Sequence, residues 1–155
     1  MKIHLDHYDK QILQILQEDG SITNSNLAKR INLSPSACLA RTKNLKEAGI
    51  IKKFATILDN EALGMGVFAF TTVNISPLNK ESIDAFVSVI EKMPEVLECY
   101  TLTGTATFLL KIVAKDIHDY GRFIIDKVTN IQGVNAIESN IVIATNKLEY
   151  TLPLE

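Results

Sequence analysis

The sequence predicts an α+β fold in two parts, a helical amino-terminal part followed by a part that alternates strands with helices. Three short segments with helix-start and helix-stop signals fill residues 6–49, and from residue 67 the apolar pattern follows the order strand, helix, strand, strand, helix, strand. The two parts also differ in their balance of basic and acidic residues. Residues 1–60 hold nine basic and six acidic residues, whereas residues 61–155 hold seven basic and twelve acidic residues. We therefore expect two domains, 1–60 and 61–155, with different partners.

Composition indicates a globular protein of the cytoplasm. The 155 residues are 46% hydrophobic, enough for packed cores in both parts. Because no run of eighteen apolar residues is present and the chain opens with a charged segment, neither a membrane span nor a signal peptide is expected. Cys38 and Cys99 lie far apart, so their spacing predicts neither a disulfide framework nor a zinc ribbon.

The first two helices are predicted from their capping residues. Asp6 is suited to cap the first helix, with Asp9 answering it as in a capping box, and Gly20 ends that helix. Thr23 or Asn24 caps a short second helix. Apolar residues at helical spacing give both helices a core face: Tyr8, Ile12, Leu13 and Leu16 in the first, and Leu27, Ala28 and Ile31 in the second.

The third helix begins at Ser34-Pro35, a cap followed by the helical position where proline costs no hydrogen bond. It runs to Ala48, and Gly49 stops it. At about 100° per residue the helix has two unlike faces. The core face carries Cys38, Thr42 and Leu45, and the opposite face carries Ser36, Ala37, Ala40 and Asn44, with Arg41 on its flank.

The remaining elements predict a ferredoxin-like βαββαβ domain, in which two helices cover one face of an antiparallel sheet. Residues 50–58 are predicted as a strand that links the two domains. The domain's own elements are predicted at 67–75, 80–93, 96–103, 107–114, 116–130 and 134–145. The other face of the sheet needs a cover, and the alternation of Leu148, Tyr150 and Leu152 predicts one further strand, exchanged or paired with a second subunit.

The three helices form a helix-turn-helix, whose last helix fits the roughly 12 Å major groove of DNA. Residues 21–53 carry seven basic residues against Glu47 alone, and such an excess favours a polyanion. Small residues let the backbone approach the duplex, and only Arg41 and Asn44 are expected to reach base edges. Phosphate contacts are expected from Ser34, Ser36, Lys29, Arg30, Lys43 and Lys46, with Asn24, Ala37 and Ala40 completing the surface. The alternative is an ordinary three-helix bundle with solvated charges.

The whole chain resembles the leucine-responsive regulatory protein/AsnC family, the feast/famine regulators. The resemblance is carried by "LDHYDKQILQILQEDG", "LSPSACLARTKNLKEAGII" and the trailing Leu58-Asp59 in the first part. In the second part it is carried by "LECYTLTG", "FLLKIVAKD" and "GVNAIESNIV". The resemblance covers the chain with few gaps.

The resemblance implies a sequence-specific, DNA-binding transcriptional regulator with no catalysis, a winged-helix-like DNA-binding domain and no metal or other cofactor. It implies homodimers that assemble to octamers, modulated by small molecules such as amino acids. The expected partner is double-stranded DNA, bound in the cytoplasm at the nucleoid and not at a membrane. In a dimer, two third helices would meet successive major grooves, so half-sites about one turn apart are expected.

The sequence departs from its family at the expected effector loop. The resemblance places effector contacts at Gly104, Thr105 and Thr107. In many members the glycine is followed by an acidic-aromatic-acidic run, and here it is followed by Thr105-Ala106-Thr107. The ammonium group of an amino acid prefers a carboxylate or several carbonyl oxygens, and threonine hydroxyls carry no charge. Three alternatives stay open: no effector, a less cationic effector, or an amino acid held by backbone groups.

Two other classes of function compete with the regulator. The candidates for an enzyme are scattered carboxylates, cysteines and histidines, and none has a catalytic or metal-binding spacing. His4 and His7 lie three apart but have no third ligand nearby in the sequence. A ligand-binding or assembly module that does not bind DNA is the second competitor, and salt-dependent binding of DNA would separate it from the regulator.

Overall fold

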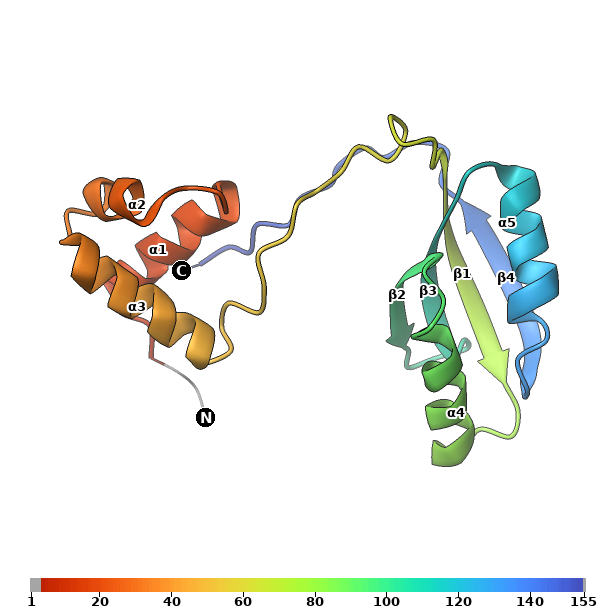
Figure 1. Ribbon diagram of the computed structural model, residues 1–155. Helices are drawn as coiled ribbons and strands as arrows, with labels where there is room; N and C mark the ends of the chain where they lie inside the picture. The colour runs from red at the N-terminus through yellow and green to blue at the C-terminus, as the bar shows by residue number, and fades with distance from the viewer. Residues whose placement is uncertain (1–3, 155) are drawn as a thin grey trace. The chain divides into compact units, whose positions relative to one another are not determined.

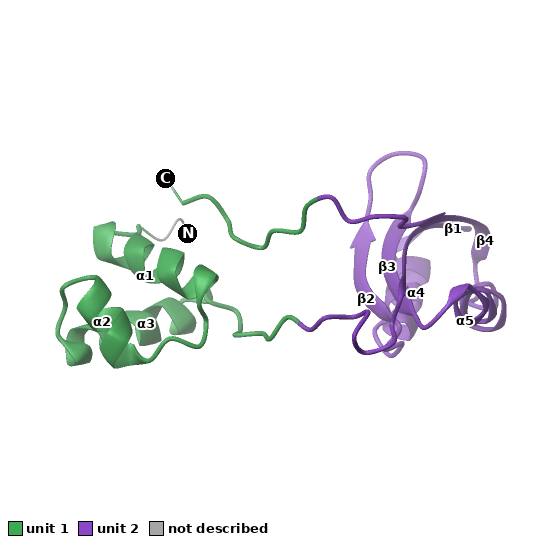
Figure 2. Ribbon diagram, turned by 90° about the horizontal axis from the view of Figure 1, so that it is seen from above, with its two compact units in different colours: residues 1–57, 147–155 green, residues 58–146 purple. Residues whose placement is uncertain are grey.

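The computed structural model describes residues 4–154 and divides into two compact units. One unit comprises residues 1–57 together with residues 147–155, and the other comprises residues 58–146 (green and purple in Figure 2). The first unit is helical and the second holds the sheet (Figure 1). The α+β fold class predicted from the sequence is confirmed. The carboxyl-terminal tail, residues 147–154, is grouped with the helical unit, although the sequence pattern had joined it to the second domain.

The helical unit contains α1 (His7–Glu18), α2 (Asn24–Arg30) and α3 (Pro35–Glu47). Their start signals are those expected from the sequence. Asp6 and Asp9 form the reciprocal capping box of α1, and the Thr23 and Ser34 hydroxyls cap α2 and α3. The three helices share one core, which consists of Ile12, Leu13, Leu27, Ala28, Ile31, Cys38 and Leu45.

The second unit is a four-stranded antiparallel sheet with strand order β2-β3-β1-β4. The strands are β1 (Val67–Ile75), β2 (Val96–Thr101), β3 (Phe108–Ala114) and β4 (Val134–Ile141). Helices α4 (Lys80–Ile90) and α5 (Ile117–Phe123) cross between them, and α5 continues into a π-helical turn, η1 (Ile124–Val128). This connectivity is the ferredoxin-like order expected from the sequence.

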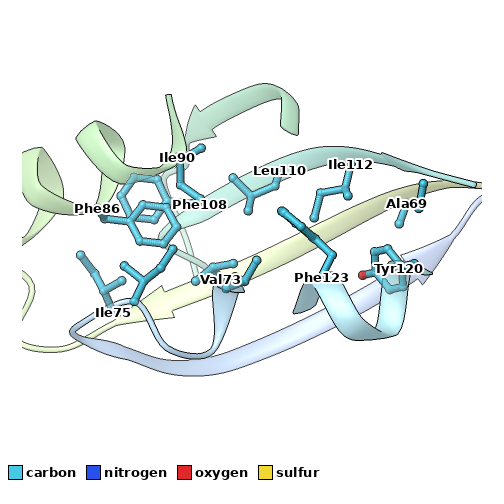
Figure 3. Close-up of a cluster of buried hydrophobic side chains, with 13 residues drawn as sticks. Ala69, Val73, Ile75, Phe86, Ile90, Phe108, Leu110, Ile112, Tyr120 and Phe123 are labelled. Carbon is cyan, nitrogen blue, oxygen red and sulfur yellow. The ribbon is translucent and has the colours of Figure 1, made fainter. Parts of the chain in front are cut away.

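The two helices of this unit cover one face of the sheet. Residues alternate along β1, so that Ala69 and Val73 are fully buried while Phe70, between them, is 40% exposed. On the covered face Phe86 of α4 stacks on Phe108 of β3, with ring centroids 4.3 Å apart (Figure 3). Tyr120 and Phe123 of α5 fill the other end of the same core (Figure 3). Neither of these two helices lies on the opposite face of the sheet (Figure 1).

Two predicted strands are not formed as such. Residues 52–58 are extended but pair with no strand in the described part of the chain, and residues 147–154 likewise join no ladder. A β-strand requires hydrogen bonds to a neighbouring backbone. Alternation of apolar and polar residues indicates only that successive side chains lie in different environments. The further strand at residues 148–152 was predicted as exchanged or paired with a second subunit, and that pairing stays a prediction.

The tail is held to the helical unit by a side chain instead. The Gln17 side-chain oxygen accepts a hydrogen bond from the Leu152 amide at 2.7 Å, and the Gln17 side-chain nitrogen donates to the Leu152 carbonyl at 3.2 Å. Leu154, two residues further, packs against the core of the three helices. One glutamine amide thus satisfies both backbone groups of an extended residue, as a neighbouring strand would do.

Candidate nucleic-acid interface

The connection between α2 and α3 sets the start of the third helix. Asn32 takes a left-handed conformation with φ of 55°, which asparagine tolerates better than most residues. The Leu33 amide then donates to the Ala28 carbonyl at 2.9 Å. This tight turn makes α2 and α3 a helix-turn-helix pair.

The amino terminus of α3 is braced by three polar side chains. The Ser34 hydroxyl accepts from the Ala37 amide at 3.2 Å and lies 3.2 Å from the Ser36 hydroxyl. Asn24, at the start of α2, donates from its side-chain nitrogen to the Pro35 carbonyl at 2.9 Å. Both serines are exposed, as phosphate contacts require, whereas the Asn24 amide already ties the two helices together.

The solvent-facing side of α3 is made of small and polar residues. Ser36, Ala37, Ala40, Lys43 and Asn44 are all exposed, as the spacing predicts. Cys38 and Leu45 are buried in the core on the opposite side, and burial raises the pKa of the Cys38 thiol. A backbone covered only by such short side chains can approach a base edge closely.

Two residues on this side of α3 were missed from the sequence. Leu39 is 59% exposed, and the Glu47 carboxylate lies 3.6 Å from the Lys43 ammonium. The same 100° spacing that places Ser36 and Lys43 outward also places Leu39 beside them. Helical spacing alone was therefore a sufficient signal for the outward position of Leu39.

Arg41 is bound within its own unit. One of its guanidinium nitrogens lies 2.7 Å from an Asp6 carboxylate oxygen and 2.9 Å from an Asp9 carboxylate oxygen, and the guanidinium carbon lies 5.4 Å from the centre of the Tyr8 ring. The hydrogen bonds to Asp6 and Asp9 raise the pKa of Arg41. The Asp9 amide, together with Arg41, lowers the pKa of Asp6. The sequence predicted that Arg41 reaches a base edge, and the structure places it against the start of α1.

The other cations surround α3 in different environments. Lys29 and Arg30 are exposed in the last turn of α2. The Lys46 ammonium lies 4.7 Å from the centre of the Phe54 ring, so part of its charge faces an aromatic surface. With Lys43, these residues give the unit four exposed cationic side chains near the helix-turn-helix.

The expected effector loop closes the β2-β3 hairpin. Gly104 has φ of 130°, a conformation that favours glycine, and both Gly104 and Thr105 are exposed. Thr107 is half-buried, and its amide and hydroxyl both donate to the Asn74 side-chain oxygen, at 2.9 and 3.4 Å. Among the three residues predicted to contact an effector, Thr107 therefore already uses its amide and hydroxyl hydrogens in bonds to Asn74.

The described residues hold no cluster of three or more histidine, cysteine or acidic side chains placed to bind a metal ion. His4 and His7 are both exposed. No helix in the described part of the chain is long and apolar enough to cross a membrane.

Comparison with known families matches both units. Residues 5–52 match a winged helix-turn-helix DNA-binding family model, and residues 68–152 match the Lrp/AsnC ligand binding domain. The chain is 54% identical to the transcriptional regulator AzlB of Bacillus subtilis over 155 residues, covering 100% of this chain and 99% of that protein. It is 33% identical to the leucine-responsive regulatory protein of Rhizobium meliloti, covering 92% of each.

Solved structures share the whole fold. The transcriptional regulator NMB0573 from Neisseria meningitidis, crystallised as an L-Met complex, superposes with a TM-score of 0.92 at 38% identity and covers 97% of each chain. An AsnC family transcriptional regulator from Agrobacterium tumefaciens gives 0.89 at 30% identity and covers 96% of this chain and 97% of that one. The family resemblance seen in the sequence is confirmed: this chain belongs to the Lrp/AsnC family of transcriptional regulators, with a helix-turn-helix DNA-binding domain and a ligand-binding domain.

Proposed function

We propose that this regulator binds double-stranded DNA sequence-specifically by laying α3 in the major groove, and that it catalyses no reaction. The observation that carries the proposal is the exposed face of α3, which combines small side chains with flanking cations in the only strongly basic segment of the sequence. Residues 61–155 hold seven basic and twelve acidic residues, a balance that does not favour a polyanion. We place the regulator in the cytoplasm, associated with the nucleoid.

The contacts divide into positioning and reading groups. The hydroxyls of Ser34 and Ser36 and the Ser36 amide, at the start of α3, are suited to one phosphate. Lys29, Arg30, Lys43 and Lys46 are suited to the phosphates beside it. Asn44 is exposed on the outer face and has the amide geometry that suits adenine. The proposed DNA surface further includes Ala37 and Ala40, which allow close approach, and Asn24, which holds α2 against α3.

Arg41 has a different proposed role. Its two ion pairs and its place over Tyr8 connect the middle of α3 to the first turn of α1. We propose that Arg41 fixes the angle between α3 and α1, and that base recognition depends on the residues of the outer face of α3. Its replacement should then weaken operator binding without relaxing the preference at one particular base pair.

The DNA-binding proposal is tested with the full chain. In vitro selection from random duplexes should yield a roughly palindromic site with half-sites about one turn apart. Lys43→Gln should weaken binding to all sequences alike, whereas Asn44→Ala should relax preference at one base pair per half-site. A chain that selects no sequence and is not retained on heparin at low salt would instead be a ligand-binding module that does not bind DNA.

We further propose an amino-acid effector at the loop that contains Gly104, Thr105 and Thr107. Support comes from the Neisseria relative, which was crystallised with L-Met at 38% identity to this chain. An ammonium needs acceptor oxygens, and the loop offers its backbone carbonyls and the hydroxyl of the exposed Thr105. Calorimetry with a panel of amino acids tests this, and Asn74→Ala should lower any affinity found by loosening the loop.

The open face of the sheet supports a homodimer that assembles further to an octamer. Phe70 and Tyr100 are 40% and 50% exposed, and the half-buried Phe68 lies on the same face of the sheet, which neither helix of this unit covers. An apolar face of this kind favours burial against a second copy. Sedimentation velocity should show a dimer or larger species, and a monomer at micromolar concentration would contradict this assignment.

A further inference from the structure

Leu39 is unusual among the side chains of the helix-turn-helix. In the described residues of α1, α2 and α3, only Tyr8 and Leu39 are exposed large hydrophobic side chains, at 38% and 59%. Tyr8 is partly covered, because the Arg41 guanidinium lies 5.4 Å from its ring centre. Leu39 is not part of the core on which α3 packs. Its exposure therefore has no explanation inside the unit.

The position of Leu39 places it on the face proposed to meet DNA. It lies three residues after Ser36 and four before Lys43, and both of these side chains are exposed. Residues three and four apart are neighbours on a helix surface. Ala40 beside it is a single methyl group, so the leucine projects beyond its neighbour. It also lies in the amino-terminal half of α3, the half that contacts base edges when a recognition helix enters the major groove.

The chemistry of the groove identifies what such a side chain can recognise. The major groove offers hydrogen-bonding groups on every base pair, but it offers one apolar group, the C5 methyl of thymine. A leucine placed against a polar edge would remove that edge from water without giving a hydrogen bond in return. Against a thymine methyl, both partners lose apolar surface to water, which is favourable.

We propose that Leu39 reads a thymine in each half-site by packing against its C5 methyl group, and so adds a specificity-determining contact to the proposed DNA-binding function. The contact supplies apolar discrimination where Ser36 and Lys43 beside it supply polar and electrostatic contacts. Because the regulator is proposed to bind as a dimer, the thymine recurs at symmetric positions of the two half-sites.

Deoxyuridine provides the test, since it differs from thymidine only by lacking that methyl. Starting from the selected operator, each thymine is replaced in turn by deoxyuridine, and affinity is measured with the wild-type chain. One thymine per half-site should show a loss of about fourfold, the value expected for burial of one methyl-sized group. Replacing it in both half-sites should give about fifteenfold if the two contacts are independent.

Variants at position 39 connect that loss to the leucine. Leu39→Ala should bind the thymine and deoxyuridine operators equally, while Leu39→Met, which keeps an apolar side chain of similar length, should keep the preference. Leu63→Ala is the matched control, because Leu63 is 62% exposed but belongs to the other unit, and it should behave as wild type. Thermal melts establish that each variant is folded, as expected for an exposed position.

The outcomes separate this inference from the function on which it rests. If Leu39→Ala remains as sensitive to deoxyuridine as the wild type, or if no single thymine methyl matters to the wild type, Leu39 does not read thymine even though the chain binds DNA specifically. If the chain selects no operator at all, the proposed function fails and the thymine contact fails with it.

Discussion

The ion pairs of Arg41 lead to a prediction that charge counting alone would not make. Arg41 and Lys29 each contribute one positive charge to the same basic segment. Lys29 is exposed in the last turn of α2, whereas Arg41 lies 2.7 and 2.9 Å from the carboxylates of Asp6 and Asp9. Replacing each in turn by glutamine removes equal formal charge from very different surroundings. The two variants should therefore differ in how salt affects DNA binding.

The magnitude follows from counterion release. Each phosphate neutralised by a protein cation contributes about 0.9 to the slope of log K against log salt, so Lys29→Gln in a dimer should reduce that slope by about 1.8. At roughly 0.1 M salt this corresponds to about eightfold in affinity per subunit. The Arg41 charge is already balanced by carboxylates, so Arg41→Gln should lower affinity through the tilt of α3 and leave the slope near the wild-type value.

Fluorescence anisotropy with a labelled operator, repeated from about 50 to 200 mM KCl, measures both quantities at once. Lys80→Gln, at the start of α4 in the other unit, serves as the control for loss of a distant charge. The reasoning is refuted if Arg41→Gln reduces the slope as much as Lys29→Gln does. That result would mean that the guanidinium leaves Asp6 and Asp9 and lies on a phosphate in the complex.

Three further predictions concern the stability of the sheet unit and the attachment of the carboxyl-terminal tail. Phe86→Ala should destabilise the sheet unit by about 3 to 5 kcal/mol, because Phe86 is 1% exposed, and guanidinium unfolding of the full chain should show it. Gln17→Met should speed hydrogen exchange of the Leu152 amide, which mass spectrometry or NMR can follow, while exchange in the sheet stays unchanged. The hydrogen bond from the Tyr100 hydroxyl lowers the pKa of Glu98. The ionised carboxylate therefore stabilises the fold above its unfolded-state pKa, and this contribution to the free energy of unfolding is lost as the pH falls below about 4.5. Glu98→Gln should flatten this part of the curve of unfolding free energy against pH.

Helix caps and apolar periodicity predicted the helices and strands well, because both depend on residues that are close in the sequence. The caps at Asp6, Thr23 and Ser34 each act within three residues, and the structure confirms all three. The strand at 67–75 was predicted with its observed bounds, because its alternation reflects one buried face. Where ends differ, as at residue 90 of α4 instead of 93, the last turn tightens: the Lys92 and Met93 amides donate to the carbonyls of Val89 and Ile90, three residues earlier.

Contacts between distant residues could not be predicted in this way. Arg41 pairs with carboxylates 35 and 32 positions earlier, and Gln17 bonds to a residue 135 positions later. Helical spacing places Arg41 on the flank of α3, but it gives no information on the two carboxylates that the start of α1 brings to that flank. The alternation of Leu148, Tyr150 and Leu152 indicated an extended segment, but it could not indicate that the Gln17 side chain binds the Leu152 amide.

The use of Arg41 inside its own unit limits how strongly one α3 can discriminate bases. Arginine bound to guanine gives the commonest specific contact in the major groove, and here the only arginine of α3 is paired with Asp6 and Asp9. Of the residues left on the outer face, only Asn44 has the paired donor and acceptor that suit a base edge, while the others are small, apolar or, like Lys43, suited to phosphate. We therefore expect each half-site to be read with modest discrimination, so that specificity depends on several subunits binding linked sites together. We predict that sequence-specific binding requires assembly of subunits. A variant that stays monomeric should bind DNA in a salt-dependent way but select no operator.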